Sequence, residues 1–210
     1  HWVNLQASLN GRDGDDAPEG RCLGAQSIGV LQKRAQNALV DAGYVTSRVV
    51  VGRQDISSGA LAFTVIPGRI GAVTLNDPDG RGHWWNALPT GPGDLLNLRD
   101  IEQGLENFKR LPTVDADIQI APAAPGASPG VSDLAISYHQ NFPFRLTLTA
   151  DNYGTKWTGR NEGSATLSWD NVIGQNDLFY VTFNHTLNFM NPDGRGTNGN
   201  TIYYAIPYGD

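Results

Sequence analysis

The last third of the chain alternates apolar and polar residues with a period of two, which a strand with one buried face can accommodate and a helix cannot. Four such runs follow Pro143, and no helical periodicity interrupts them. The runs lie at 144–150, 165–169, 178–185 and 202–206. We therefore expect four antiparallel strands in a meander, which form a region separate from the preceding part of the chain.

The connections between these strands differ in length. Residues 151–162 and 188–200 are long and polar, whereas 170–177 is short. Outer-membrane barrels have long external loops and short periplasmic turns, so this asymmetry is typical of such a barrel. Aromatic residues near the strand ends favour the same interpretation; they are Trp157, Trp169, Tyr180 and Tyr204. A soluble β-sandwich also buries one face of its sheet, so the pattern alone leaves that alternative open.

Ahead of this region, we expect a helix followed by two strands. Residues 1–27 are polar and rich in glycine and aspartate, and they read as loop. Apolar residues then recur at helical spacing, with Ser27 suited to cap the helix and Gly43 suited to end it. Two β-rich runs follow at 46–51 and 60–66.

The same order of elements recurs further along the chain. A strand-like run at 69–75 is followed by a helix at 98–111 and by strands at 116–120 and 133–138. The number of positions between the apolar face of the helix and the final strand is nearly the same in both sets. We interpret the two sets as an internal structural repeat.

Charge and hydropathy exclude two classes of function. The chain has 21 acidic and 15 basic residues and a net charge of -6, so it offers no cationic surface for a nucleic-acid backbone. No stretch approaches the roughly 20 consecutive apolar residues that a spanning helix needs. The sequence therefore predicts neither a nucleic-acid partner nor a membrane helix.

Catalytic and metal-binding signatures are also missing from the sequence. His83, His139 and His185 lie far apart and show no ligand spacing, so we predict no metal site. The chain has no nucleophile elbow, no phosphate-binding loop and no convincing catalytic pair. We predict that it is not an enzyme and that it uses no cofactor.

Cys22 is the only cysteine, so no disulfide can form within the chain. Two readings stay open: a lone thiol, or a disulfide whose partner lies upstream. The chain begins with His1 rather than Met, and no secretory leader follows. We therefore expect the natural N-terminus to be missing.

Three groups of residues resemble one family. They read RCLG at 21–24, GYVTSR at 43–48 and QDISSGAL at 54–61; LNLRDIEQGLE at 96–106, RLP at 110–112 and GVSDL at 130–134; and DNYG at 151–154, DNVIGQND at 170–177 and IPYG at 206–209. They resemble the outer-membrane transporters of two-partner secretion, the ShlB/FhaC/HecB-type haemolysin secretion/activation proteins, among which are the transporters of contact-dependent inhibition. These belong to the Omp85 superfamily, together with the barrel-assembly proteins.

The resemblance implies an α+β fold of POTRA modules, each ordered β-α-α-β-β, followed by the first antiparallel strands of an outer-membrane β-barrel. Residues 1–67 would be the C-terminal part of a first POTRA domain, 68–142 a second POTRA domain, and 143–210 about four strands of an incomplete barrel. Family members also have a plug helix, the rest of a sixteen-stranded barrel and commonly an upstream cysteine. We therefore expect a fragment, in which the residue matching Cys22 has lost its disulfide partner.

The resemblance also implies a function, which is to capture an extended secreted exoprotein in the periplasm and pass it to the barrel pore. The client would be a haemolysin, an adhesin or a contact-dependent inhibition toxin with an N-terminal secretion domain. The expected location is the outer membrane of a Gram-negative bacterium, with membrane lipid as the second partner. A barrel-assembly factor of the same superfamily and a soluble periplasmic POTRA scaffold are alternatives.

Edge strands are the candidate binding sites, because their unpaired N–H and C=O groups can pair with an extended client. In the first module the candidates are Arg48, Val49, Val50 and Val51, with Gln54 nearby. In the second module they are Asp117, Ile118, Gln119 and Ile120. Main-chain pairing of this kind does not demand one client sequence, which suits a transporter.

Overall fold

The computed structural model describes residues 3–11, 13–155, 159–187 and 196–208. These residues contain three separate sheets, with strand orders β1-β2, β3-β5-β4 and β6-β7-β8-β9. Contacts divide the chain into two compact units. The first unit comprises His1–Thr74, Thr90–Gln103 and Ile118–Ile136, and the second comprises Leu75–Pro89, Gly104–Asp117 and Ser137–Asp210.

The first unit begins with two helices and a two-stranded sheet. These elements are α1 (Leu5–Ser8), α2 (Ala25–Asp41), β1 (Arg48–Val50) and β2 (Thr64–Ile66). Gly43 ends α2 as expected, because it adopts φ +95°, a conformation that glycine tolerates best. The expected cap at Ser27 is wrong, since α2 starts earlier, with Gly24 as its N-cap and no side-chain cap. The expected loop over residues 1–27 likewise contains α1.

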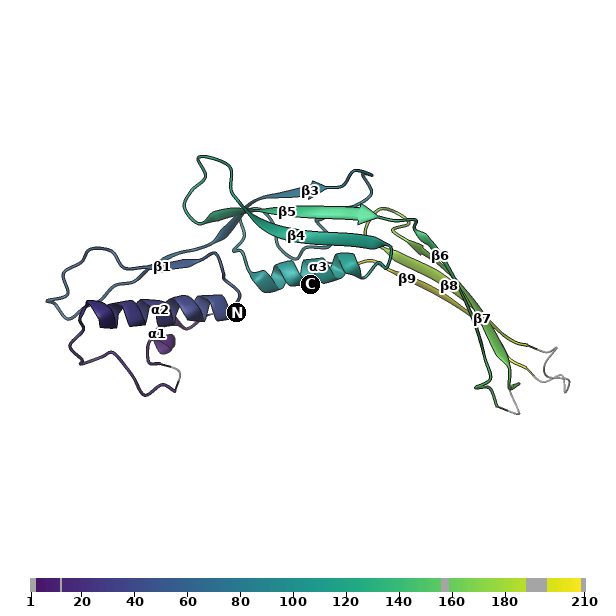
Figure 1. Cartoon of the computed structure of the whole chain (residues 1–210), viewed down its shortest axis with the longest axis horizontal. Helices are drawn as coiled ribbons and strands as arrows, with labels where there is room; N and C mark the ends of the chain where they lie inside the picture. The colour runs from purple at the N-terminus through teal and green to yellow at the C-terminus, as the bar shows by residue number, and fades with distance from the viewer. Residues whose placement is uncertain (1–2, 12, 156–158, 188–195, 209–210) are drawn as a thin grey trace. The chain divides into compact units, whose positions relative to one another are not determined.

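The core of this part forms between α2 and β1, which lie side by side in Figure 1. Ala35 and Leu39 of α2 pack with Val49 of β1, and the half-buried Tyr44 and Phe63 close the cluster. The apolar spacing on α2 thus produces one buried face, as a helix packed on a sheet requires.

The sheet β3-β5-β4 and the helix α3 form the second module. Their bounds are β3 (Arg69–Asn76), α3 (Leu98–Lys109), β4 (Val114–Pro122) and β5 (Val131–Gln140). Side chains along β5 alternate between buried and exposed positions, and Leu134, Ile136 and Tyr138 are almost fully buried. Phe108 of α3 meets Tyr138 edge-on, with ring centroids 5.7 Å apart. A single turn at 84–88 occupies the place expected for a first helix.

The C-terminal sheet is the four-stranded antiparallel meander that the alternating pattern predicts. Its strands are β6 (Phe144–Asp151), β7 (Glu162–Asp170), β8 (Leu178–Thr186) and β9 (Asn198–Ala205), each paired with its neighbours in sequence. Both ends of β6, β7 and β8 lie within a few residues of the expected bounds. β9 starts four residues earlier than expected. Trp157, expected near a strand end, lies outside the described residues.

Over the part of the chain that the structure describes, no helix has both the length and the apolar character needed to cross a membrane.

Candidate functional site

The outward backbone groups of β1 are already bonded to side chains of α2. The N–H of Val49 donates to Oε1 of Gln36 at 2.9 Å, and Nε2 of Gln32 donates to the Val49 carbonyl at 2.8 Å. Backbone groups alternate in direction along an antiparallel strand, so those of Arg48 and Val50 face β2. The predicted docking edge in the first module is therefore occupied by two glutamines.

The open edge of this sheet belongs to β2 instead. Val65 lies opposite Val49, so by the same alternation its N–H and C=O face away from β1. Val65 is exposed, and no described residue hydrogen-bonds to these two groups from outside the sheet. β2 is consequently the strand of the first module that can accept another strand.

Gln54 has a structural role in this part of the chain. Its Nε2 donates to the Ala62 carbonyl at 2.9 Å, and its Oε1 accepts the Ala62 N–H at 2.7 Å. This paired amide closes the loop between β1 and β2, so both polar ends of Gln54 are engaged. Val51, the last residue of the predicted edge, lies just beyond β1.

The four predicted residues of the second module lie on β4, which is an edge strand of its sheet. Asp117, Gln119 and Ile120 are exposed, and Ile118 is half-buried. Docking of a client at this edge stays a prediction.

The other edge strand of this sheet, β3, is partly covered. The N–H of Ile70 donates to the Asp94 carbonyl at 3.0 Å, and the N–H of Gly93 donates to the Ile70 carbonyl at 2.7 Å. A loop thus pairs with the outer side of β3 near its start.

A buried polar cluster surrounds the short turn between β7 and β8, which we name the 170–177 turn. Asp170 is fully buried, and its carboxylate accepts hydrogen bonds from Nη2 of Arg145 at 2.8 Å and from Oγ1 of Thr113 at 2.8 Å. The Thr113 backbone N–H donates to the same carboxylate at 3.2 Å. The bonds and the ion pair compensate for the burial of this charge.

The turn itself is organised by the second buried carboxylate. Asp177 accepts the backbone N–H groups of Val172, Ile173 and Gln175 at 3.1 to 3.3 Å. Asn176 adopts φ +53°, in the left-handed region that asparagine tolerates better than most residues. The carboxylate and the left-handed asparagine together fix the path of the turn.

Side chains of the turn reach two other segments of the second unit. Nδ2 of Asn176 donates to the His83 carbonyl at 2.7 Å and to Oδ1 of Asn86 at 3.0 Å. Nδ2 of Asn171 donates to the Arg81 carbonyl at 2.8 Å. Arg110, directly after α3, donates to the Asn176 carbonyl at 3.3 Å. The 170–177 turn is thereby fastened to the segment 81–86 and to the end of α3, which belong to the second module.

This junction was missed by reasoning from the sequence. The pattern DNVIGQND identified a short turn and contributed to the family resemblance, but it gave no role to the individual side chains. Two aspartates bracket the turn and two asparagines lie next to them, and this pattern was the signal that could have indicated a polar junction.

The four C-terminal strands present two chemically different faces. Strand register aligns Leu146 with Leu167, and Leu167 with Val181, and Val181 with Ile202. The opposite face aligns hydroxyl groups, including Thr166 with Thr182, whose oxygens lie 2.9 Å apart. Other residues of this face are Arg145, Thr147, Thr149, Ser164, Ser168, Tyr180, Thr201 and Tyr203.

The apolar face has no protein cover among the described residues. Leu148 is 70% exposed and Ile202 is 74% exposed, and Leu146, Leu167 and Phe183 are also exposed. A contiguous exposed apolar patch is uncommon on a soluble monomer and marks a surface that meets another apolar phase. Strands of a membrane barrel have two such faces, an apolar one toward lipid and a polar one toward the lumen.

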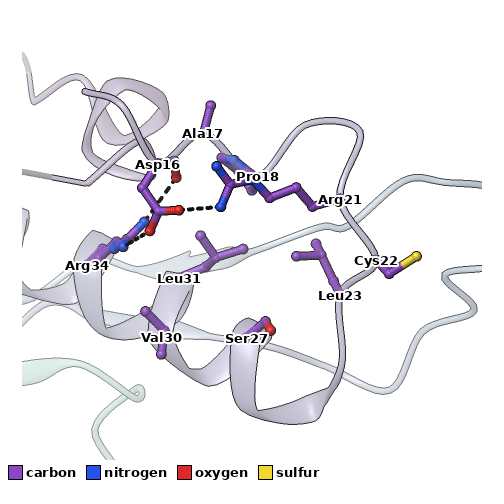
Figure 2. A pocket seen from close by; sticks show the side chains of 10 residues that line it. All are labelled: Asp16, Ala17, Pro18, Arg21, Cys22, Leu23, Ser27, Val30, Leu31 and Arg34. Carbon is purple, nitrogen blue, oxygen red and sulfur yellow. Dashed lines mark hydrogen bonds and ion pairs between the residues drawn. The ribbon is translucent and has the colours of Figure 1, made fainter. Parts of the chain in front are cut away.

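The only cysteine lies beside a small cavity near the start of α2, shown in Figure 2. The cavity has a volume of about 260 Å³. Asp16 forms ion pairs with Arg34 and Arg21, and the hydrogen bond and charge of Arg34 hold the pKa of Asp16 below its ordinary value. Cys22 is exposed and free in the described chain, and its sulfur points away from these ion pairs. Its upstream partner stays a prediction.

Within the residues described, no group of three or more histidines, cysteines or carboxylates is placed to hold a metal ion.

Three family models match consecutive parts of the chain. Residues 16–68 match the ShlB-type POTRA domain, residues 69–122 match a POTRA domain, and residues 130–210 match the haemolysin secretion/activation protein ShlB/FhaC/HecB. The matches cover both modules and the C-terminal sheet, so the fold is that of POTRA modules followed by an antiparallel sheet of the ShlB/FhaC/HecB type.

Curated relatives and solved structures agree with these matches. The chain is 42% identical to the outer membrane transporter CdiB-2 of Burkholderia pseudomallei over 191 residues, and 31% identical to the hemolysin transporter protein ShlB of Serratia marcescens over 192 residues. Each alignment covers 90% of this chain and 32% of the relative, so the chain spans about a third of their length. The structure of CdiB from Acinetobacter baumannii matches with a TM-score of 0.76 and 27% identity over 98% of this chain and 38% of that one.

Proposed function

The chain belongs to the family of ShlB/FhaC/HecB-type haemolysin secretion/activation proteins, and from this membership we propose that it forms part of an outer-membrane transporter of a two-partner secretion system. The transporter captures an extended exoprotein in the periplasm and passes it through a barrel to which β6–β9 contribute. The client carries an N-terminal secretion domain and is a haemolysin, an adhesin or a contact-dependent inhibition toxin.

The uncovered apolar face of β6–β9 is the observation that carries this proposal. An apolar face in contact with lipid needs no protein cover, whereas the corresponding face of a soluble sandwich is covered by a second sheet. The polar opposite face, with its aligned hydroxyl groups, suits the lumen through which a hydrated chain moves. The proposed domain limits are 1–67 and 68–142 for the two POTRA modules and 143–210 for the barrel strands.

We assign client capture to one edge strand in each module. In the second module this is β4, including Asp117, Ile118, Gln119 and Ile120. In the first module we place it on β2, because Gln36 and Gln32 occupy the outward groups of β1. The main-chain hydrogen bonds involved contribute about 0.5 to 1.5 kcal/mol each, which is weak enough for the client to be released. The role requires no catalytic residue and no cofactor.

Fractionation of the source cells tests the proposal. Antibodies to residues 68–142 should detect an outer-membrane band whose mobility changes on heating, which is the behaviour of a folded barrel. Deletion of the gene should retain the exoprotein in the periplasm. A soluble periplasmic band, with export unaffected by the deletion, would instead indicate a POTRA scaffold with no transport role.

A further inference from the structure

An open groove lies where the C-terminal sheet meets the second module, within the second unit. It has a volume of about 520 Å³, and its wall includes Arg81, Gln140, Phe144, Trp169 and Ile173. A second groove of about 520 Å³ shares Arg81, Gln140 and Phe144 with it and adds Phe142. The two grooves form one continuous surface, which we name the basal groove.

Aromatic rings form the apolar wall of the basal groove. The ring centroids of Phe142 and Phe144 are 5.6 Å apart, and those of Phe144 and Trp169 are 4.7 Å apart. Phe142 is 76% exposed, and the other two rings are also exposed. Phe144 and Trp169 face each other across β6 and β7 on the apolar face of the sheet, in line with Leu146 and Leu167. The groove is thus the end of the apolar face nearest the short 170–177 turn.

Arg81 supplies a free positive charge at this end. Its backbone is fixed, because its N–H donates to Oδ2 of Asp77 at 2.5 Å and its carbonyl accepts Nδ2 of Asn171 at 2.8 Å. Its guanidinium, in contrast, makes no hydrogen bond or ion pair with any described residue and is exposed. His83 lines the same part of the groove.

Two acidic residues line the groove, one of them buried and the other away from Trp169. Asp170 lines the groove, but its carboxylate is fully buried and bonded to Arg145 at 2.8 Å. Asp79, whose side chain is 43% exposed, lines only the part of the groove that also contains Phe142, where it lies 3.9 Å from Nδ1 of His139. In the part of the groove that contains Trp169, the exposed charge is therefore that of Arg81, beside an aromatic wall.

We propose that the basal groove binds a phospholipid of the periplasmic leaflet, with the headgroup phosphate at Arg81 and the acyl chains against Phe144 and Trp169. This proposal rests on the proposed function, since it requires β6–β9 to lie in the membrane. A short turn marks the periplasmic end of a barrel strand, which is where headgroups of that leaflet lie. Aromatic side chains favour that interface, and an arginine there can reach a phosphate.

A transported polypeptide is a less suitable occupant than a lipid. The basal groove opens on the apolar face of β6 and β7, whereas a chain in transit would contact the polar face that carries Thr147 and Thr166. Lipid acyl chains in the groove would extend directly along the apolar face of the sheet. The groove therefore matches a ligand with one anionic group and an extended apolar part.

The test uses the full-length transporter, purified in mild detergent and titrated with phosphatidylglycerol, with native mass spectrometry to count bound lipid. We expect Arg81→Gln to weaken retention about fivefold, which corresponds to about 1 kcal/mol for one arginine at an anionic membrane surface. Arg53→Gln is the matched control, because Arg53 is also exposed and does not line the groove. Diacylglycerol, which lacks the phosphate, should bind equally to the unaltered protein and to both variants.

Four other outcomes would contradict the proposal, and each would point to a different explanation. Competition by glycerol 3-phosphate as effective as that by phosphatidylglycerol would overturn the lipid assignment in favour of a free phosphate ester. Equal retention by Arg81→Gln and Arg53→Gln, with both proteins heat-modifiable in the outer membrane, would overturn the proposal and leave the transporter function intact. Unchanged lipid binding with weakened binding of the exoprotein secretion domain would identify a protein-docking surface instead. Absence of the unaltered protein from the outer membrane would overturn both the transporter function and the lipid site.

Discussion

Nη2 of Arg145 lies 2.8 Å from Oδ1 of Asp170, and this pair joins the first residues of β6 to the last residue of β7 at the base of the C-terminal sheet. Asp170 is fully buried, while the Arg145 side chain is about one-third exposed. Nε of Arg145 is buried and has no hydrogen-bond partner among the described residues. The guanidinium thus depends on Asp170 for compensation of its buried part.

We predict that Asp170→Asn destabilises the protein by about 2 to 3 kcal/mol, because the near-isosteric amide removes the charge that Arg145 and Thr113 engage. Urea titration of the full-length protein in micelles measures the free energy of unfolding. Arg145→Gln combined with Asp170→Asn should recover part of the loss, since no unpaired charge remains. Additive effects of the two substitutions would show that the pair is not coupled.

The sequence predicted the strands of this sheet well, because a period of two is visible in the residues themselves. It did not predict the burial of Asp170, whose partner Thr113 is 57 positions away, or of Asn176, whose partner His83 is 93 positions away. Only the packing of the turn against the second module brings these groups together. A local pattern carries no information about such distant partners.

The docking edge of the first module illustrates the same limit. A β-rich run indicates a strand, but it does not show which of its sides is open. Gln36 and Gln32 read as polar residues of an amphipathic helix, and their bonds to Val49 require the helix to lie alongside β1. In the second module the predicted residues do lie on an edge strand, since β4 is at one end of the observed strand order.

The two faces of β6 predict opposite effects for neighbouring substitutions. Leu148→Lys places a charge on the apolar face and should cost about 2 to 4 kcal/mol if it lies near the middle of the membrane. Thr147→Lys lies on the polar face and should be close to neutral. The amount of heat-modifiable protein in the outer membrane measures both effects. A larger loss for Thr147→Lys would mean that the faces are reversed.

Acid should loosen the segment that contains Asp16. Its pKa lies below the ordinary value of 3.8, chiefly because of the hydrogen bond and charge of Arg34. A lowered carboxyl pKa means that the stabilising contribution is fully present above about pH 3.8 and is lost as the pH falls through the folded-state pKa. The protection of the backbone amides of residues 13–17 against hydrogen exchange, relative to the intrinsic rate at each pH, should fall over that range. In Asp16→Asn the exchange should already be fast at neutral pH and should lack this acid-dependent step.

Proline at Val65 is the sharpest test of the open edge on β2. Val65→Pro removes a backbone donor that faces away from β1, so the β1–β2 pairing should persist while a client loses one main-chain hydrogen bond. Since such a bond contributes about 0.5 to 1.5 kcal/mol, binding of the exoprotein secretion domain should weaken about two- to tenfold. Val65→Ala keeps the donor and should bind normally. Val50→Pro removes a donor that faces β2, so it should destabilise the module. Normal client binding by a folded Val65→Pro protein would rule out docking at β2 and leave β4 as the capture edge.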